Sequence, residues 1–259
     1  MTSIQKVVLI GSGNVATQLA IIFLDKGIDI IQVYSLHLNN ANELAEKIGC
    51  EAIDDLSELD QDADLYIIAI KDDAIYALND HGFHLPGKLV VHTSGSAPLE
   101  AIHKISEITG VFYPLQTFSK HRVVHWEKIP VCIEASDPET GELLHEFAER
   151  ITGSVFHIDS PTRRRLHLAA VFANNFTNYL LGVANEIVGE KLPFTILEPL
   201  IQETLDKAVD MGPDAAQTGP AIRCDHKTIE AHLKLLETNP AAKELYEIIS
   251  GMIGNKKIG

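Results

Sequence analysis

Cysteine, positive charge and long apolar runs are all scarce in this sequence of 259 residues. The three cysteines, Cys50, Cys132 and Cys224, do not have the spacing of a C-x-x-C pair or a metal site, so we expect reduced thiols in a reducing compartment. The 21 basic residues are outnumbered by 36 acidic ones, which gives a formal charge of −15. Such a chain repels nucleic acid and anionic lipid, so local groups must hold any phosphate-bearing ligand.

Membrane and export signals are also missing from the sequence. No apolar run approaches the roughly 18 residues that suggest a membrane span, and the segment from Met1 to Lys6 lacks the basic start and apolar stretch of a signal peptide. We therefore expect a cytoplasmic protein with no membrane partner. Hydrophobic residues make up 46% of the chain, which is enough for packed cores.

Short apolar, β-branched runs alternate with amphipathic stretches from Lys6 to about Asp159. This alternation is typical of a parallel sheet covered by helices. The patterns predict strands at 7–10, 28–34, 65–70, 89–92 and 131–133, and helices at 14–26 and 40–48, the second of which ends at Gly49 as its C-terminal cap. After Ser160-Pro161 they predict only helices, at 166–188, 195–211 and 227–236. We predict an α/β fold in which an N-terminal parallel-sheet domain, residues 1–160, precedes an all-α domain, residues 161–259.

A glycine-rich turn, G-S-G-N-V-A at residues 11–16, directly follows the first strand and opens the first helix. Gly11 permits the tight turn, and Gly13 lets the backbone approach a pyrophosphate. The free N–H groups at the start of the helix supply an anion site. The turn therefore predicts a Rossmann-like dinucleotide-binding domain, whose cofactor contacts residues 11–15: Gly11, Ser12, Gly13, Asn14 and Val15. The alternative is a tight turn that serves packing only.

The segment after the second strand bears on the choice of cofactor. It has no Asp or Glu to bind an adenosine 2′-hydroxyl, which favours NADP over NAD. No Arg follows either, so Ser35 and His37 are the expected polar partners of a 2′-phosphate. Ile70 and Lys71, at the end of the central strand, complete the predicted cofactor residues. A glycine loop also suits the phosphate tail of the deazaflavin F420, so NAD and F420 stay open as alternatives.

A polar stripe marks the first helix of the second domain. His167, Val171, Asn174 and Asn178 fall at i, i+4, i+7 and i+11, and hence on one face of a regular helix. A buried polar group costs about 1 to 3 kcal/mol unless it is paired. The stripe therefore either faces a substrate or makes hydrogen bonds within the core or a dimer contact. The same helix is apolar nearly all round, so we expect it to be buried, partly by a second subunit in a homodimer.

Further candidates lie on loops. Ser94 and Gly95 follow the strand at 89–92, at the edge where such sheets bind ligands. Arg223, near a glycine turn, suits a substrate carboxylate, with an interdomain ion pair as the alternative. The candidate catalytic residues are therefore His167, Asn174, Arg223 and Ser94. His92 could donate a proton, but a histidine near a strand end is more often packed.

Two kinds of site are not expected. The pairs His81 with His84 and His121 with His125 lack a Cys or carboxylate cluster, so we predict no metal site. The absence of G-x-S-x-G argues against an α/β-hydrolase.

Asp225 is the predicted N-cap of the helix that follows it.

Several segments resemble a known family. They are the glycine turn, the strand and turn 63–73, the Thr93–Ser96 loop, 113–118, the helix 167–178 and the segment 218–225. With them the chain resembles Rossmann-like NADP oxidoreductases related to pyrroline-5-carboxylate reductase and the 6-phosphogluconate dehydrogenase superfamily, in a group with its own helical C-terminal domain (DUF2520-type). It departs from the pattern at Leu36, Tyr113 and Cys224, where that group commonly has Arg, His and Gly.

Two functions follow from these observations. The first is an NADP-dependent reductase or dehydrogenase that acts on a small imine or carbonyl substrate with a carboxylate, which Arg223 would bind. The second is a module that senses a nucleotide without turning it over, since no single acid–base residue stands out. An F420-dependent reductase of the same fold is a further alternative.

Overall fold

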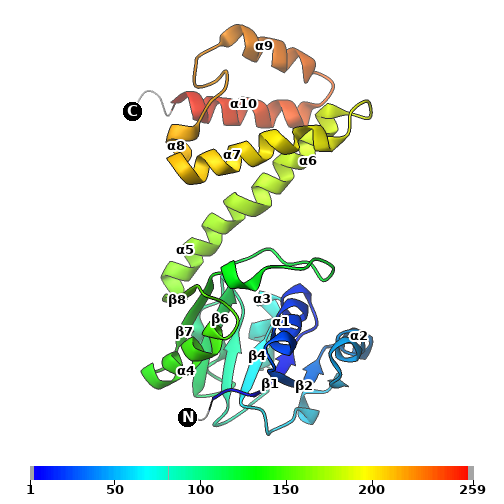
Figure 1. The fold of residues 1–259 in the computed structure, drawn as a ribbon, viewed down its shortest axis with the longest axis vertical. Coiled ribbons are helices and arrows are strands. Elements are labelled where there is room, and N and C mark those ends of the chain that lie inside the picture. The colour runs from blue at the N-terminus through cyan, green and yellow to red at the C-terminus, as the bar shows by residue number, and fades with distance from the viewer. Residues whose placement is uncertain (1–2, 81, 256–259) are drawn as a thin grey trace. The chain divides into compact units, whose positions relative to one another are not determined.

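The computed structural model of this chain describes residues 3–80 and 82–255 (Figure 1). Its contacts divide the chain into two compact units, Met1–Asn175 and Phe176–Gly259. The all-helical part of the sequence begins at Ser160, soon after the last strand ends at His157.

An eight-stranded sheet forms the centre of the first unit, in the order β3-β2-β1-β4-β5-β6-β7-β8. The strands are β1 Lys6–Ile10, β2 Asp29–Tyr34, β3 Glu51–Ile53, β4 Leu65–Ile68, β5 Leu89–His92, β6 Ile108–Pro114, β7 Val131–Ala135 and β8 Val155–His157. Neighbouring strands are parallel except for β6 and β7, which are antiparallel. This parallel-dominant order is that of a Rossmann-like domain.

The sequence prediction of this sheet needs two corrections. All five predicted strands are present, but β7 runs antiparallel to β6, against the expectation of a wholly parallel sheet. Three further strands were not predicted. β3 and β8 have only three residues each, too few for a recognisable alternation. In β6, Gly110 and Pro114 interrupt the apolar pattern, and Gly110 is needed because a Cβ there would lie 2.5 Å from the Leu144 side chain.

Five α-helices belong to the first unit: α1 Asn14–Asp25, α2 Leu38–Ile48, α3 Asp72–Asp80, α4 Pro138–Glu149 and α5 Ser160–Ala170. α2 ends at Gly49, whose φ of 77° is left-handed, as the sequence predicted for a C-terminal cap. Short 3₁₀ turns lie at Leu56–Glu58, Leu99–Ile102 and Trp126–Lys128.

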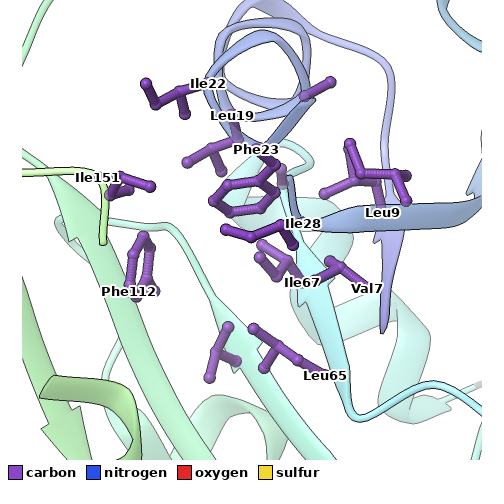
Figure 2. Close-up of a cluster of buried hydrophobic side chains, with 14 of the residues drawn as sticks. Val7, Leu9, Leu19, Ile22, Phe23, Ile28, Leu65, Ile67, Phe112 and Ile151 are labelled. Atoms are coloured by element: carbon purple, nitrogen blue, oxygen red, sulfur yellow. The ribbon is translucent and has the colours of Figure 1, made fainter. Parts of the chain in front are cut away.

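Two hydrophobic clusters cover the two faces of the sheet. Along β4, Leu65 and Ile67 belong to one cluster, and Tyr66 and Ile68 to the other, so all four residues of this strand are buried. Figure 2 shows the first cluster, in which Phe23 and neighbouring side chains of α1 pack over the strands. Burial of such side chains contributes about 25 cal/mol per Å² of apolar area and is the main force that holds α1 on β1 and β4.

The second unit is helical. Its α-helices are α6 Thr177–Val188, α7 Glu198–Met211, α8 Pro213–Ala216, α9 His226–Leu235 and α10 Pro240–Asn255, with a 3₁₀ turn at Phe194–Leu197. α10 was not predicted from the sequence. Asp225 caps α9 as expected, because its carboxylate accepts a hydrogen bond from the Thr228 N–H at 3.3 Å.

The helix predicted at 166–188 is not a regular α-helix. A π-helical turn at Val171–Phe176 separates α5 from α6. In the single chain this helix is exposed over much of its length: Phe172 is 61% exposed, Tyr179 is 62% exposed, and no residue of α6 is buried. The expectation that a second subunit covers part of it stays a prediction.

Candidate functional site

The register of the sheet defines one edge of the first unit. Tyr34, Ile10, Ile68, His92 and Val111 lie in one row across β2, β1, β4, β5 and β6. Because these five strands are parallel, the residues that follow the row all lie at the carboxyl edge of the sheet. Ligands bind at this edge in doubly wound folds. Most of the candidate residues follow one of these five strands and therefore lie along it.

The glycine loop between β1 and α1 fits a pyrophosphate. Gly11 has a φ of 125°, and a Cβ there would overlap the carbonyl oxygen of Ala69, so glycine is required. Gly13 is different, because a Cβ at this position would meet nothing within 4 Å. Gly13 is also the N-cap of α1, which has no side-chain cap and no acidic residue in its first turn. The open space and the uncapped amides together suit an anionic group.

The other predicted cofactor residues lie along the same edge. The Ser12 and Ser35 hydroxyls are 3.1 Å apart, so the glycine loop and the end of β2 are joined by a hydrogen bond. His37 is the exposed N-cap residue of α2 and makes no capping bond with its side chain. Among the rest, Asn14 and Lys71 are exposed, and Val15 and Ile70 are half-buried. The contacts of these residues with a cofactor stay a prediction.

Ser94 shapes the loop that follows β5. Its hydroxyl oxygen accepts hydrogen bonds from the Ser96 N–H at 3.1 Å and the Ala97 N–H at 2.9 Å. Its own N–H donates to Nδ1 of His92 at 3.2 Å. Burial, assisted by the positive charge of Arg163, lowers the pKa of His92 to about 4. His92 is therefore a neutral, packed histidine that supports the loop. This agrees with the expectation that a histidine near a strand end is packed and does not donate a proton.

His167 and Tyr113 form a pair beside this loop. The Tyr113 hydroxyl and Nδ1 of His167 are 3.0 Å apart, and the rings meet edge to face at 5.9 Å. Both pack against Gly95, where a Cβ would lie 2.5 Å from Nδ1 of His167 and 2.9 Å from the Tyr113 ring. Burial raises the pKa of Tyr113 to about 12, so the phenol keeps its proton at neutral pH.

Sequence reasoning treated Tyr113 only as a departure from a family pattern. One signal for it was available, because Tyr113 stands just before Pro114 at the end of an apolar run. The pairing with His167, which is 54 residues away, becomes visible only in the folded chain.

Arg163, which the sequence analysis did not single out, attaches α5 to the sheet. It is fully buried and forms an ion pair with Glu134 of β7. Its guanidinium also donates to the Ala97 carbonyl oxygen at 2.6 Å and to the Ser160 hydroxyl at 3.1 Å. Arg164 Nε donates to the Ser96 carbonyl oxygen at 3.1 Å. These contacts hold the Ser94–Ala97 loop against the helix that carries His167.

Three of the four catalytic candidates belong to the first unit. Ser94 and His167 lie on adjoining segments of the first unit, whereas Asn174 is exposed within the π-helical turn. That turn interrupts the regular α-helical spacing on which the polar stripe relied, and a shared face for His167, Asn174 and Asn178 stays a prediction. Arg223 is an exposed residue of the second unit, and its role stays a prediction.

Metal and membrane features were searched for among residues 3–80 and 82–255. No group of three or more His, Cys, Asp or Glu side chains in these ranges could hold a metal ion, while His81 lies outside the described residues. None of the helices described is long and apolar enough to cross a membrane.

Comparisons with known proteins agree with this geometry. Residues 6–95 match a family described as "NADP oxidoreductase coenzyme F420-dependent", and residues 129–253 match "Domain of unknown function (DUF2520)". The crystal structure of a "putative NADP oxidoreductase" from Bacteroides fragilis is 43% identical, covers 97% of this chain and 98% of its own, and superposes with a TM-score of 0.90. A search of the curated proteins found no match.

More distant structures share the fold. A reductive aminase from Aspergillus terreus, in complex with NADPH and ethyl-5-oxohexanoate, is 17% identical over 98% of this chain and 93% of its own, with a TM-score of 0.69. A pyrroline-5-carboxylate reductase from Coxiella burnetii is 19% identical over 99% of this chain and 98% of its own, with a TM-score of 0.58.

The fold and the glycine loop thus define an oxidoreductase of the dinucleotide-binding type. The chain belongs to the family of the "putative NADP oxidoreductase" from Bacteroides fragilis. The segment that matches DUF2520 includes β7 and β8 of the sheet as well as the helices that follow.

Proposed function

We propose that this protein is an NADP-dependent reductase or dehydrogenase of a small imine or carbonyl compound that bears a carboxylate. The observation that carries the proposal is the Tyr113–His167 pair, which packs against Gly95 at the sheet edge that also carries the glycine loop. A proton-transferring pair and a dinucleotide loop at one edge are the two parts that such a reaction needs.

The bound cofactor would supply the hydride, and residues of the first unit would hold the cofactor. The amides at the start of α1 bind the pyrophosphate in the space beside Gly13, where a side chain would otherwise project. Ser12 and Ser35, joined by their hydroxyls, lie on the adenosine side of this loop. The Ser94–Ala97 loop, two strands away in the sheet, lies on the nicotinamide side.

The proton that balances the hydride comes from His167. The imidazolium form of His167 gives one proton to the substrate nitrogen or oxygen and becomes neutral. Tyr113 orients the ring by accepting a hydrogen bond from Nδ1–H, and its high pKa prevents it from losing its own proton. The packing of both rings against Gly95 fixes their positions, which limits the entropy lost on reaching the reactive geometry.

The proposed substrate class has two supports. The distant structures with this fold include a reductive aminase and a pyrroline-5-carboxylate reductase, whose names refer to imine chemistry. Arg223 offers an exposed guanidinium, which binds carboxylates in a bidentate manner. We further infer that the protein acts in the cytoplasm as a homodimer, for which the uncovered apolar helices argue.

The test combines binding and turnover. Thermal-shift assays with NADP, NAD and F420 identify the cofactor, because a ligand that binds only the folded state raises the Tm. Oxidation of the reduced cofactor is then followed with a panel of cyclic imines and 2-oxo acids. We expect His167→Gln to lower kcat by about 10² to 10⁴-fold, the usual contribution of an acid–base group, with nucleotide binding retained.

The competing function gives a different result. A nucleotide-sensing module would bind the dinucleotide and show no turnover with any substrate. Turnover that survives in both His167→Gln and Tyr113→Phe would contradict the assigned roles while leaving the cofactor assignment intact.

A further inference from the structure

The adenosine 2′-phosphate of NADP needs a cation, and the residues that directly follow β2 do not supply one. In the segment that runs from the end of β2 through α2, residues 35–48, the one lysine or arginine is Lys47, in the last turn of α2. Ser35 and His37 offer polar groups at the start of this segment but no permanent positive charge. In a chain of net charge −15, a phosphate at this position calls for a cation from another part of the fold.

The segment between β6 and β7 is rich in basic residues and lies on α1. Lys120, His121 and Arg122 are consecutive there. Gln18 of α1 is only 1% exposed, and its side-chain amide donates to the carbonyl oxygens of Ser119 at 2.6 Å and Arg122 at 2.9 Å. The helix that begins at the glycine loop therefore holds this basic segment in place. Figure 1 shows the segment in green, next to α1 in blue.

Lys120 extends from this segment to α2. Its Nζ lies 3.5 Å from Oε2 of Glu43, and its side chain is 24% exposed. Glu43 also has a closer partner, since Lys47 Nζ lies 3.0 Å from Oε1. Hydrogen bonding from Lys47 and the charge of Lys120 lower the pKa of Glu43. An exposed pair at 3.5 Å contributes little, so Lys120 can leave Glu43 for a better anion at small cost.

Resting on the proposed use of NADP, we infer that Lys120 is the residue that binds the adenosine 2′-phosphate and makes the protein prefer NADP over NAD. The geometry points to it because Lys120 is held beside α2, the helix that starts directly after Ser35 and His37. A phosphate dianion attracts an ammonium group more strongly than a solvated carboxylate that is already paired with Lys47. His121 and Arg122, both exposed, add positive potential to the same segment.

The experiment measures the Kd of NADPH and of NADH for the full chain. Trp126 is the single tryptophan, stacked on Phe118 at 5.4 Å next to the basic segment, so energy transfer from it to the dihydronicotinamide reports binding without any substrate. We expect Lys120→Ala to weaken NADPH about tenfold or more, as for the loss of a hydrogen bond to a charged group, and to leave NADH unchanged. Lys120→Arg should retain most of the preference.

Lys128→Ala is the matched control, since Lys128 is an exposed lysine that lies after the basic segment and should leave both affinities unchanged. An unaltered NADPH to NADH ratio in Lys120→Ala would overturn the inference alone. A chain that binds neither nucleotide before any substitution would instead remove the proposed function, and this inference with it.

Discussion

At the scale of single residues, the two glycines of the cofactor loop have opposite constraints. Gly11 is constrained by the protein, since its positive φ and the nearby Ala69 carbonyl oxygen exclude any side chain. Gly13 has an ordinary φ of −77° and open space around it, so nothing in the protein excludes a side chain there. The predicted role of Gly13 is to leave this space free for the pyrophosphate of a bound dinucleotide.

This contrast gives the first prediction. Gly13→Val should abolish NADP binding while the Tm of the free protein changes little, because the side chain would occupy the space of the pyrophosphate and its Cβ would meet no protein atom within 4 Å. Gly11→Val should lower the Tm or prevent folding. Calorimetric titration and thermal melts measure the two effects. Full NADP affinity in Gly13→Val would show that the loop is a packing turn.

At the scale of elements, a partly buried ion pair between Arg163 and Glu134 helps to attach α5 to the sheet. The Arg163 side chain is 1% exposed and that of Glu134 is 17% exposed, so neither charge is well solvated. Arg163 Nε is buried without a hydrogen-bond partner, although the other guanidinium nitrogens are bonded to Glu134, Ala97 and Ser160. The same helix carries His167 one turn later, so the attachment also positions the proposed acid.

Arg163→Met should therefore destabilise the first unit by about 1 to 3 kcal/mol, because the partly buried Glu134 carboxylate loses its charged hydrogen-bond partner. Arg165→Met is the control, since Arg165 is exposed and should change the free energy of unfolding by less than about 0.5 kcal/mol. Urea unfolding measures both. Adding Glu134→Gln to Arg163→Met should recover part of the loss, and equal effects of the two arginine substitutions would contradict the assigned pairing.

At the scale of the whole molecule, the helices of the second unit leave much apolar surface uncovered. No residue of α6 or α7 is buried, and Val209 is 84% exposed. Large exposed side chains occur on α6, α7 and α10, among them Tyr179, Leu200, Val209, Met211 and Met252. Contiguous exposed apolar surface is uncommon on monomers and marks contact surfaces, so we infer that these side chains contact a partner. A second copy of the chain is the simplest cover, because two-fold pairing buries the same patch on both subunits.

We predict a homodimer that persists at concentrations well below micromolar, as obligate apolar interfaces do. Sedimentation equilibrium should return twice the 28.4 kDa of the chain across this range. Leu200→Glu and Tyr179→Glu place charges on the exposed face and should shift the equilibrium towards monomer, whereas Val123→Glu alters an exposed apolar residue of the first unit and should not. A 28.4 kDa mass for the native chain at all concentrations would refute the prediction.

The sequence alone determined the order of the fold and the location of the nucleotide loop. Short apolar, β-branched runs identified five strands, because a strand buried on both faces of a sheet needs apolar residues at nearly every position. The glycine loop was readable for a similar reason, since its backbone constraints act within a few residues of Gly11 and Gly13. Gly49 and Asp225 were identified as helix caps on equally local grounds.

Only the tertiary structure decided which distant side chains meet. Tyr113 pairs with His167 over 54 residues, and Lys120 reaches Glu43 over 77 residues. Arg163 is buried while its neighbours Arg164 and Arg165 are exposed, although all three positions hold the same type of residue. Such contacts depend on strand order and register, which arise from the packing of the whole sheet. A local pattern carries no information about them, because it is the same whichever strand becomes its neighbour.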